Sequence, residues 1–267
     1  MTVFSMWRFA VWALLAVAMQ LGGCGSTSKD LTKNNAEQLY KDAKEDMDSG
    51  SYDRALKTLE RVEGLAAGTV LAQQALLDMA YLNWRTGERT TAITTVDRFI
   101  KLNPSSPALD YALYLKGLIN FNDNLGLLGN AFGQNLSERD QRASRDAYQA
   151  FKQLVDQFPK SRYSADARQR MNFIVNSLAS YEVHVARYYL RRGAYVAAAA
   201  RAQQAVTEYQ QSPAAEEALY ILVASYDKLD LPVLRDDAAR VLRLNYPNSP
   251  YLGESVVQRD KPWWKIW

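Results

Sequence analysis

One stretch decides the fold of this chain: residues 76–104, LLDMAYLNWRTGERTTAITTVDRFIKLNP. Apolar residues recur in it at helical spacing on both sides of the polar turn Thr86-Gly87-Glu88. They are Leu76, Ala80 and Trp84 before the turn, and Ala92, Val96 and Phe99 after it. Spacings of three and four residues place these side chains on one face of each helix. The stretch therefore predicts two amphipathic helices joined by a short turn.

The same pattern recurs along the chain. A turn glycine precedes a small helix residue by five positions in three places: Gly50 and Ala55, Gly87 and Ala92, and Gly193 and Ala198. Related proline turns follow at 103–107, 158–163 and 246–251. These features are typical of tetratricopeptide repeats. The sequence predicts an all-α fold, a right-handed solenoid of about five tetratricopeptide-like helix pairs with a concave binding surface. The pairs are expected at residues 36–68, 74–106, 108–161, 165–212 and 214–248.

The third pair contains an insertion. Thirty residues separate Gly117 from Ala147, where about twelve are expected. The extra segment, residues 120–141, holds three glycines and several asparagines, a composition that predicts a loop and not a longer helix. A loop inserted in a repeat array usually lies on the binding side. We therefore expect it to fill or gate the groove.

The N-terminal residues have the composition of a secretory signal. One basic residue, Arg8, precedes the apolar run from Phe9 to Met19, which is about half the length of a membrane-spanning helix. Leu21-Gly22-Gly23-Cys24 matches a bacterial lipobox. We expect residues 1–23 to be cleaved as a lipoprotein signal peptide and Cys24 to carry diacylglycerol and an acyl chain. The alternative is a secreted protein with an unmodified cysteine near the cleavage site.

The residues after Cys24 predict where the lipid would hold the protein. Gly25 takes the place of the aspartate that favours retention at the inner membrane, so the periplasmic face of the outer membrane is the expected location. Residues 24–35 are polar and have few apolar anchors. We expect them to form a lipidated flexible tether.

The composition excludes several functional classes. The 267 residues include 32 basic and 29 acidic side chains, one His and one Cys. A net charge of +3 does not predict nucleic-acid binding, and a single cysteine forms no disulfide within the chain. His184 has no second histidine as a metal partner, and no phosphate-binding Gly-Lys-Ser/Thr sequence is present. The sequence predicts no enzyme, metal or cofactor, although a hydrolase with paired carboxylates stays open.

Aromatic residues supply the first candidate binding surface. Tyr81, Trp84, Tyr111 and Tyr114 fall in the expected first helices of the second and third pairs, which line the inner face of such solenoids. One interpretation is a groove that stacks on an extended peptide. The other is packing between neighbouring helix pairs.

Two further features lie in the C-terminal half. Arg201 is the lone charge in the small-residue helix AYVAAAARAQQA, residues 194–205, and is a candidate for partner binding. The alternative is an arginine that is simply solvated. The tail, residues 249–267, ends in KPWWKIW. Its tryptophans can dock on a partner, lie at a lipid interface or fold back on the end of the solenoid.

Several of these stretches together resemble the BamD (ComL-type) family of outer membrane β-barrel assembly lipoproteins. They are residues 97–104 (DRFIKLNP), 110–118, Phe132-Gly133 with Arg139-Asp140, and 181–194. The resemblance implies a non-catalytic subunit that binds an integral barrel protein's periplasmic domains, accessory lipoproteins and unfolded outer membrane proteins. It also implies that repeats within 36–161 bind substrate peptides, that repeats within 165–248 dock the barrel component, and that Arg201 is the docking arginine.

Two other functions are compatible with the residues. A periplasmic tetratricopeptide adaptor for cell-wall synthesis or division would use the same repeats, but it has no need of the inserted loop with Phe132 and Arg139. A periplasmic hydrolase would need a catalytic group, for which His184 is the obvious residue to test.

Overall fold

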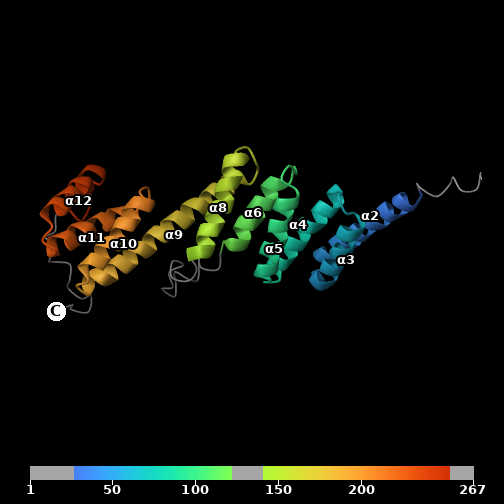
Figure 1. Ribbon diagram of the computed structural model, residues 1–267, viewed down its shortest axis with the longest axis horizontal. Coiled ribbons are helices and arrows are strands. Elements are labelled where there is room, and N and C mark those ends of the chain that lie inside the picture. The colour runs from blue at the N-terminus through green and yellow to red at the C-terminus, as the bar shows by residue number, and fades with distance from the viewer. Residues whose placement is uncertain (1–26, 122–140, 253–267) are drawn as a thin grey trace, which may run out of the picture. The chain divides into compact units, whose positions relative to one another are not determined.

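The computed structural model describes residues 27–121 and 141–252 (Figure 1). Within these ranges the chain forms ten α-helices and no strand. The all-α prediction is thus confirmed. The helices are α2 (Thr27–Asp48), α3 (Tyr52–Leu65), α4 (Val70–Arg85), α5 (Arg89–Leu102), α6 (Leu109–Asn120), α8 (Gln141–Gln157), α9 (Ser164–Arg191), α10 (Tyr195–Glu208), α11 (Ala214–Lys228) and α12 (Pro232–Asn245).

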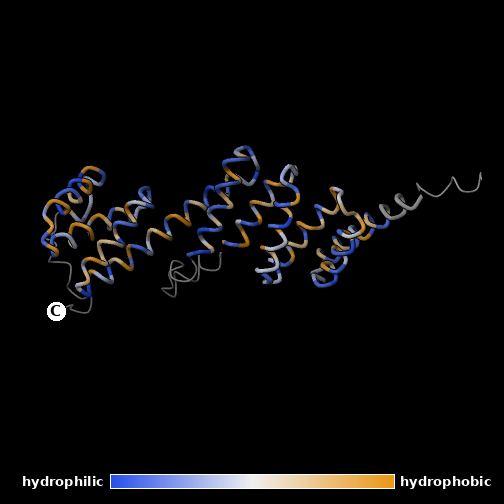
Figure 2. Tube along the Cα trace, in the orientation of Figure 1, coloured by the Kyte–Doolittle hydropathy of each residue, from blue (hydrophilic) through white to orange (hydrophobic). Residues whose placement is uncertain are grey.

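Consecutive helices pack as pairs, in agreement with the predicted repeat. The chain divides into two compact units, residues 1–112 and 113–267, with the boundary inside α6. In the first unit, α2 packs on α3, α3 on α4 and α4 on α5. In the second unit, α8 packs on α9, α9 on α10 and α11, and α11 on α10 and α12. Apolar residues recur along one side of these helices (Figure 2), which is the side that each helix buries.

Glycine turns join the two helices of a pair, as the sequence predicts. Gly50, Gly87 and Gly193 have φ values of +79°, +88° and +75°, in the left-handed region that glycine adopts without a steric penalty. Asp230 takes the same place between α11 and α12, with φ of 57°. The alanines five residues after the glycines are fully buried where the helices approach: Ala55, Ala92 and Ala198.

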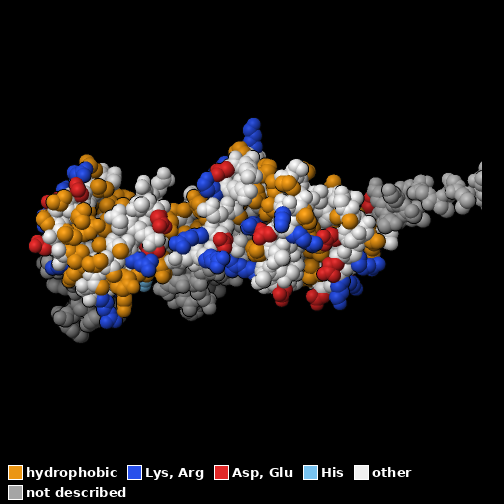
Figure 3. All heavy atoms as spheres, viewed as in Figure 1, with side chains coloured by type: hydrophobic (Ala, Val, Ile, Leu, Met, Phe, Trp, Pro, Cys, Tyr) orange, Lys and Arg blue, Asp and Glu red, His pale blue; other side chains and the backbone are white. Residues whose placement is uncertain are grey.

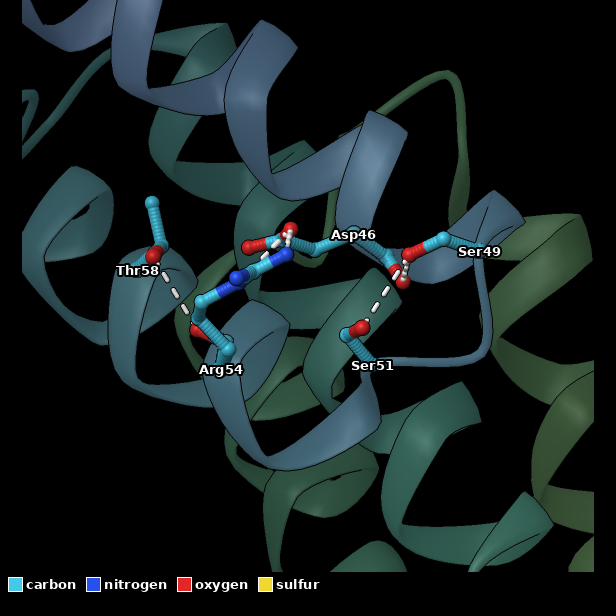
Figure 4. Close-up of polar contacts among 5 residues, drawn as sticks. All are labelled: Asp46, Ser49, Ser51, Arg54 and Thr58. Atoms are coloured by element: carbon cyan, nitrogen blue, oxygen red, sulfur yellow. Dashed lines mark hydrogen bonds and ion pairs between the residues drawn. The ribbon is translucent and has the colours of Figure 1, made fainter.

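The turn at Gly50 shows how side chains support this geometry (Figure 4). Arg54 at the start of α3 reaches back to α2, and its Nε donates to Asp46 Oδ1 over 2.8 Å. Ser49 donates to the carbonyl of Asp46 over 3.0 Å, and the hydroxyls of Ser49 and Ser51 lie 3.1 Å apart. The end of α2 and the beginning of α3 are therefore held together on both sides of the glycine.

A second kind of turn connects one pair to the next, and we call it the hydroxyl turn. The backbone N–H of a Ser or Thr donates to the carbonyl three residues earlier, over 2.9–3.1 Å, in residues 66–69, 103–106, 158–161, 209–212 and 246–249. In four of the five the serine Oγ also accepts a backbone N–H two residues later, at Ala108, Tyr163, Ala214 and Tyr251. The proline turns at 103–107, 158–163 and 246–251 predicted three of these. The turns at 66–69 and 209–212 lack the early proline, and the sequence reading missed them.

A close helix contact accounts for one glycine inside a helix. An ideal Cβ placed on Gly117 in α6 would lie 2.3 Å from Cε1 of Phe151 in α8. The ring of Phe151 is fully buried, so it has no open space into which to move. Gly117 is required there because its missing side chain leaves the volume that the phenylalanine ring fills.

Helix α2 begins within the segment that we expect to form a flexible tether, residues 24–35. Residues 27–35 of that segment belong to α2. The physical reason is that no Gly or Pro occurs between Thr27 and Asp48, so the helix propagates toward the N-terminus from its packed half. The expected signal peptide at residues 1–23, Cys24, residues 122–140 of the expected loop and residues 253–267 of the tail lie outside the described residues. None of the described helices combines the length and the apolar character that crossing a bilayer requires.

Candidate partner-binding site

Arg201 lies on α10 among small residues that α10 buries against its neighbours. Ala198, Ala199, Ala202 and Ala205 form that buried face, with exposed fractions between 0 and 7%. The Arg201 side chain is 41% exposed, and its Nη1 lies 3.1 Å from Oε2 of Glu182 on α9. The side chain of Glu182 is only 2% exposed. The structure therefore joins a surface guanidinium to a buried carboxylate.

This pair gives Arg201 a role that sequence reasoning did not identify. A carboxylate as buried as Glu182 is costly without a cation or donor, and Arg201 provides both. The contact uses one of the five guanidinium N–H groups. Because the side chain is also 41% exposed, donors of Arg201 can reach a carboxylate on another protein. The only sequence signal was an acidic residue, Glu182, on the apolar side of a predicted helix.

A second ion pair joins α9 to α11. Arg187 on α9 makes a bidentate contact with Glu217 on α11, with Nε 2.6 Å and Nη2 2.7 Å from the two carboxylate oxygens. The hydrogen bond to Glu217 raises the pKa of Arg187. Close by in sequence, the guanidinium of Arg192 lies 5.3 Å from the ring centre of the 45% exposed Tyr188. Arginine and tyrosine are enriched among the residues that contribute most of the binding energy at protein–protein interfaces.

Tyr81 and Trp84 come together in the first unit. Both lie on α4 and are half-buried, and their ring centres are 5.9 Å apart in an edge-on arrangement. Tyr111, at the start of α6, is also half-buried, and its backbone N–H donates to Asp110 Oδ1 over 2.7 Å. These three residues are therefore partly exposed to solvent, as a peptide-binding role requires.

Tyr114 is different from the other three aromatic candidates. It belongs to the second unit, where it stacks on Tyr163 with ring centres 4.8 Å apart and donates its hydroxyl to Asp166 over 2.7 Å. Burial, followed by the hydrogen bond to Asp166, raises the pKa of Tyr114. Burial alone would raise the pKa of Asp166, but hydrogen bonds from Arg170 and Tyr114 lower it overall. These contacts support the packing interpretation for Tyr114.

The described residues hold no group of three or more His, Cys, Asp or Glu side chains that could bind a metal ion. His184 is half-buried within α9. The ion pairs described above connect α9 with α10 and α9 with α11.

Comparisons with known proteins give a consistent result. The YfiO family model, described as an outer membrane lipoprotein, matches residues 32–242. A protein of Neisseria meningitidis serogroup B named outer membrane protein assembly factor BamD is 42% identical over 259 residues, covering 95% of this chain and 97% of the relative. Proteins of the same name from Haemophilus influenzae and Vibrio cholerae are 34% and 30% identical. They cover 92% and 87% of this chain, and 97% and 96% of their own lengths.

Proposed function

Because the chain belongs to the YfiO family of outer membrane lipoproteins, we propose that it is an outer membrane protein assembly factor. It acts by binding and not by catalysis. The repeats within 36–161 receive segments of unfolded outer membrane proteins, and the repeats within 165–248 dock an integral barrel assembly protein through its periplasmic domains. Accessory lipoproteins are further partners. No cofactor is needed for these tasks.

The observation that carries this proposal is the contact between Arg201 and Glu182. Glu182 holds the guanidinium at the surface of α10 in one orientation, which lowers the entropy that a partner must remove on binding. The binding surface then accepts an acidic side chain of the barrel component, because Arg201 has further donors and is 41% exposed. Glu182 thus acts as a positioning residue for Arg201.

The location of the protein in this proposal follows from the lipid on Cys24. Two or more acyl chains on Cys24 hold the protein at the periplasmic face of the outer membrane, since each buried methylene contributes roughly 0.8 kcal/mol. The repeats are then concentrated near a membrane-embedded partner without any further contact. This arrangement suits a protein that delivers substrates to a barrel in the same membrane.

The experiment is an affinity pull-down from solubilised outer membranes with the full-length chain. Wild type is compared with Arg201→Glu and with the control Arg98→Glu. Arg98 is the matched residue, because its side chain is 47% exposed and it also pairs with a carboxylate on the neighbouring helix, Glu63, over 2.9 Å. We expect wild type and Arg98→Glu to recover a large β-barrel protein and Arg201→Glu to lose it.

The other outcomes contradict different parts of the proposal. Recovery of the barrel protein by all three forms would keep the function and remove Arg201 as the docking residue. Recovery of cell-wall synthesis or division proteins in place of the barrel protein would contradict the function itself. A thermal melt of each variant identifies loss of binding that results from unfolding.

A further inference from the structure

The large hydrophobic side chains that the first unit exposes lie at one end of its helices. Among the described residues of this unit they are Leu65, Val70 and Leu102, with exposed fractions of 41, 64 and 64%. Leu65 and Val70 flank the hydroxyl turn 66–69, and Leu102 precedes the hydroxyl turn 103–106. Single exposed hydrophobic residues are common, but a group of them in one place marks an interaction surface.

Two polar contacts hold these helix ends side by side. Near the end of α5, Arg98 pairs with Glu63 near the end of α3, with Nη1 2.9 Å from Oε1. The hydroxyl of Ser106 donates to Oε1 of Gln73 over 2.8 Å, which joins the second hydroxyl turn to the first turn of α4. The ends of α3 and α5 and the start of α4 are therefore neighbours, and we call this the hydroxyl-turn end of the unit.

The repeat geometry does not require leucine at these places. Leu65 and Leu102 each lie four residues before the Ser or Thr of a hydroxyl turn. In the second unit the equivalent residues are all exposed and polar: Gln157, Glu208 and Asn245. The two leucines are therefore a property of the first unit and not of the turn.

The opposite end of the first unit is polar. It carries the turns at Gly50 and Gly87, within the two helix pairs. Exposed polar residues surround these turns: Asp48, Asp53, Thr86, Glu88 and Thr90. Charged side chains gather along the lower edge of this unit in Figure 3, where Figure 1 places the turns after α2 and α4. The two ends of the same helices thus differ in polarity.

Helix α2 leaves the unit from the apolar end. Ala36 of α2 is fully buried and packs with Ala66 and Ala72, which belong to the first hydroxyl turn and the start of α4. From Ala36 the helix continues back to Thr27, nine residues away, over about 14 Å. Cys24, the residue expected to carry the lipid, is three residues before Thr27, at most about 11 Å further. The hydroxyl-turn end is therefore the end that faces the expected anchor.

We propose that the hydroxyl-turn end of the first unit contacts the surface of the lipid bilayer, with Leu65, Val70 and Leu102 inserted among the lipid headgroups. This inference rests on the lipid that the proposed function places on Cys24. The contact needs α2 to lie along the bilayer, because an upright α2 would hold the turns about 14 Å above the residue where the helix begins. Lys101, the exposed neighbour of Leu102, then reaches the lipid phosphates. Apolar residues beside a basic one are the combination that binds membrane interfaces.

The test places a fluorophore at this end of the lipidated protein, in vesicles of phosphatidylethanolamine and phosphatidylglycerol. Cys24 is the only cysteine of the chain and is occupied by the lipid, so Val70→Cys introduces one free thiol for labelling. Phospholipids with a nitroxide on the acyl chain should lower the fluorescence of a probe on residue 70 at least about twofold. Thr90→Cys is the control, because Thr90 is exposed at the opposite end of the same unit. A probe there should keep its fluorescence.

A pair of substitutions tests the leucines themselves. In Leu65→Ser with Leu102→Ser, most of the quenching at residue 70 should be lost, because two inserted side chains become polar. The matched control is Leu231→Ser with Leu244→Ser. These leucines of the second unit are 42 and 70% exposed, against 41 and 64% for Leu65 and Leu102. This control should leave the quenching unchanged.

Flotation of the vesicles in a density gradient separates the possible failures. Protein that does not float with them would overturn the anchor on Cys24, and this inference with it. Protein that floats while its probe on residue 70 is quenched no more than the probe on residue 90 would overturn the membrane contact alone. Shielding of residue 70 from aqueous iodide without quenching by the lipid would assign the surface to another protein, and would also overturn the proposal. If the double leucine variant proves unfolded in a thermal melt, the comparison of residues 70 and 90 decides the question.

Discussion

Arg201 and Glu182 share one hydrogen bond across 3.1 Å but lie in different environments, the arginine at 41% exposure and the glutamate at 2%. Losing the partner should therefore cost more stability when Glu182 is left behind than when Arg201 is left behind. Removing the guanidinium leaves a buried charge, whereas removing the carboxylate leaves a solvated one. Any substitution of Arg201 is for this reason a test of stability as well as of binding.

Arg201→Gln should destabilise the second unit by about 1–3 kcal/mol, because the Glu182 carboxylate loses its charged partner. Replacing the glutamate as well, in Arg201→Gln with Glu182→Gln, should recover a large part of this loss, since a neutral amide is less costly to bury. Urea unfolding curves of the three proteins measure both effects. A double variant no more stable than Arg201→Gln alone would mean that the buried charge does not control the energetics.

Gly117→Ala should destabilise the chain by about 1–3 kcal/mol, because the added methyl overlaps the buried ring of Phe151. The control is Gly64→Ala. Gly64 is also helical, and a Cβ there meets nothing within 4 Å, so alanine should stabilise by up to about 1 kcal/mol. Both changes are read from thermal unfolding. The two variants should change the free energy of unfolding in opposite directions. Equal changes would contradict the packing assigned to α6 and α8.

Acidification should weaken the contact between α6 and α9. The pKa of Asp166 is lowered in the folded protein, so the carboxylate contributes stability above its ordinary pKa of about 4 and loses it as the pH falls through the lower folded value. Asp166→Asn removes the titrating group. The melting temperature of this variant should therefore fall less than that of wild type between about pH 5 and pH 2. Parallel curves for the two proteins would exclude Asp166 as a source of the acid sensitivity.

Cys24→Ala should release the protein from membranes while its helical content stays the same, because the lipid is the expected anchor and Cys24 lies outside the described helices. Membrane fractionation followed by circular dichroism measures both properties. Retention of the variant in the outer membrane would mean that protein contacts are sufficient for anchoring.

Trp84→Ala should weaken binding of peptides from the C-termini of barrel proteins by roughly tenfold, because a half-buried ring beside Tyr81 provides a stacking surface. Phe173→Ala is the control, since Phe173 is a 41% exposed aromatic residue in the second unit and is not a groove candidate. Fluorescence anisotropy of a labelled peptide gives the two dissociation constants. Equal losses would remove Trp84 from the binding surface.

The repeat was predictable because its turns require particular residue types at particular positions. A left-handed residue favours glycine, so Gly50, Gly87 and Gly193 marked the turns within pairs directly. The hydroxyl turns at 66–69 and 209–212 were less visible, because their backbone bonds tolerate residues other than proline at the second position. Residue type alone then gives a weak signal.

The side-chain pairs were not predictable in the same way. Glu182 and Arg201 are 19 residues apart, and Tyr114 and Asp166 are 52 apart. Helical periodicity assigns each residue to a face, but it does not say which residue of the neighbouring helix lies opposite. The sequence could therefore name Arg201 and Tyr114 as candidates without identifying the carboxylates that fix their roles.

The length and continuity of helix α9 determine how its two ends move relative to each other. It runs for 28 residues without a glycine or proline, and it carries Asp166 near one end and Arg187 near the other. At 1.5 Å per residue these two contact points are about 32 Å apart, a distance that a continuous helix keeps nearly constant. The helix therefore fixes the separation of its two contact points within the second unit. A displacement of α9 where it meets α6 should therefore tilt the whole helix, including the end that carries Arg187, because α9 contains no glycine or proline at which it could bend.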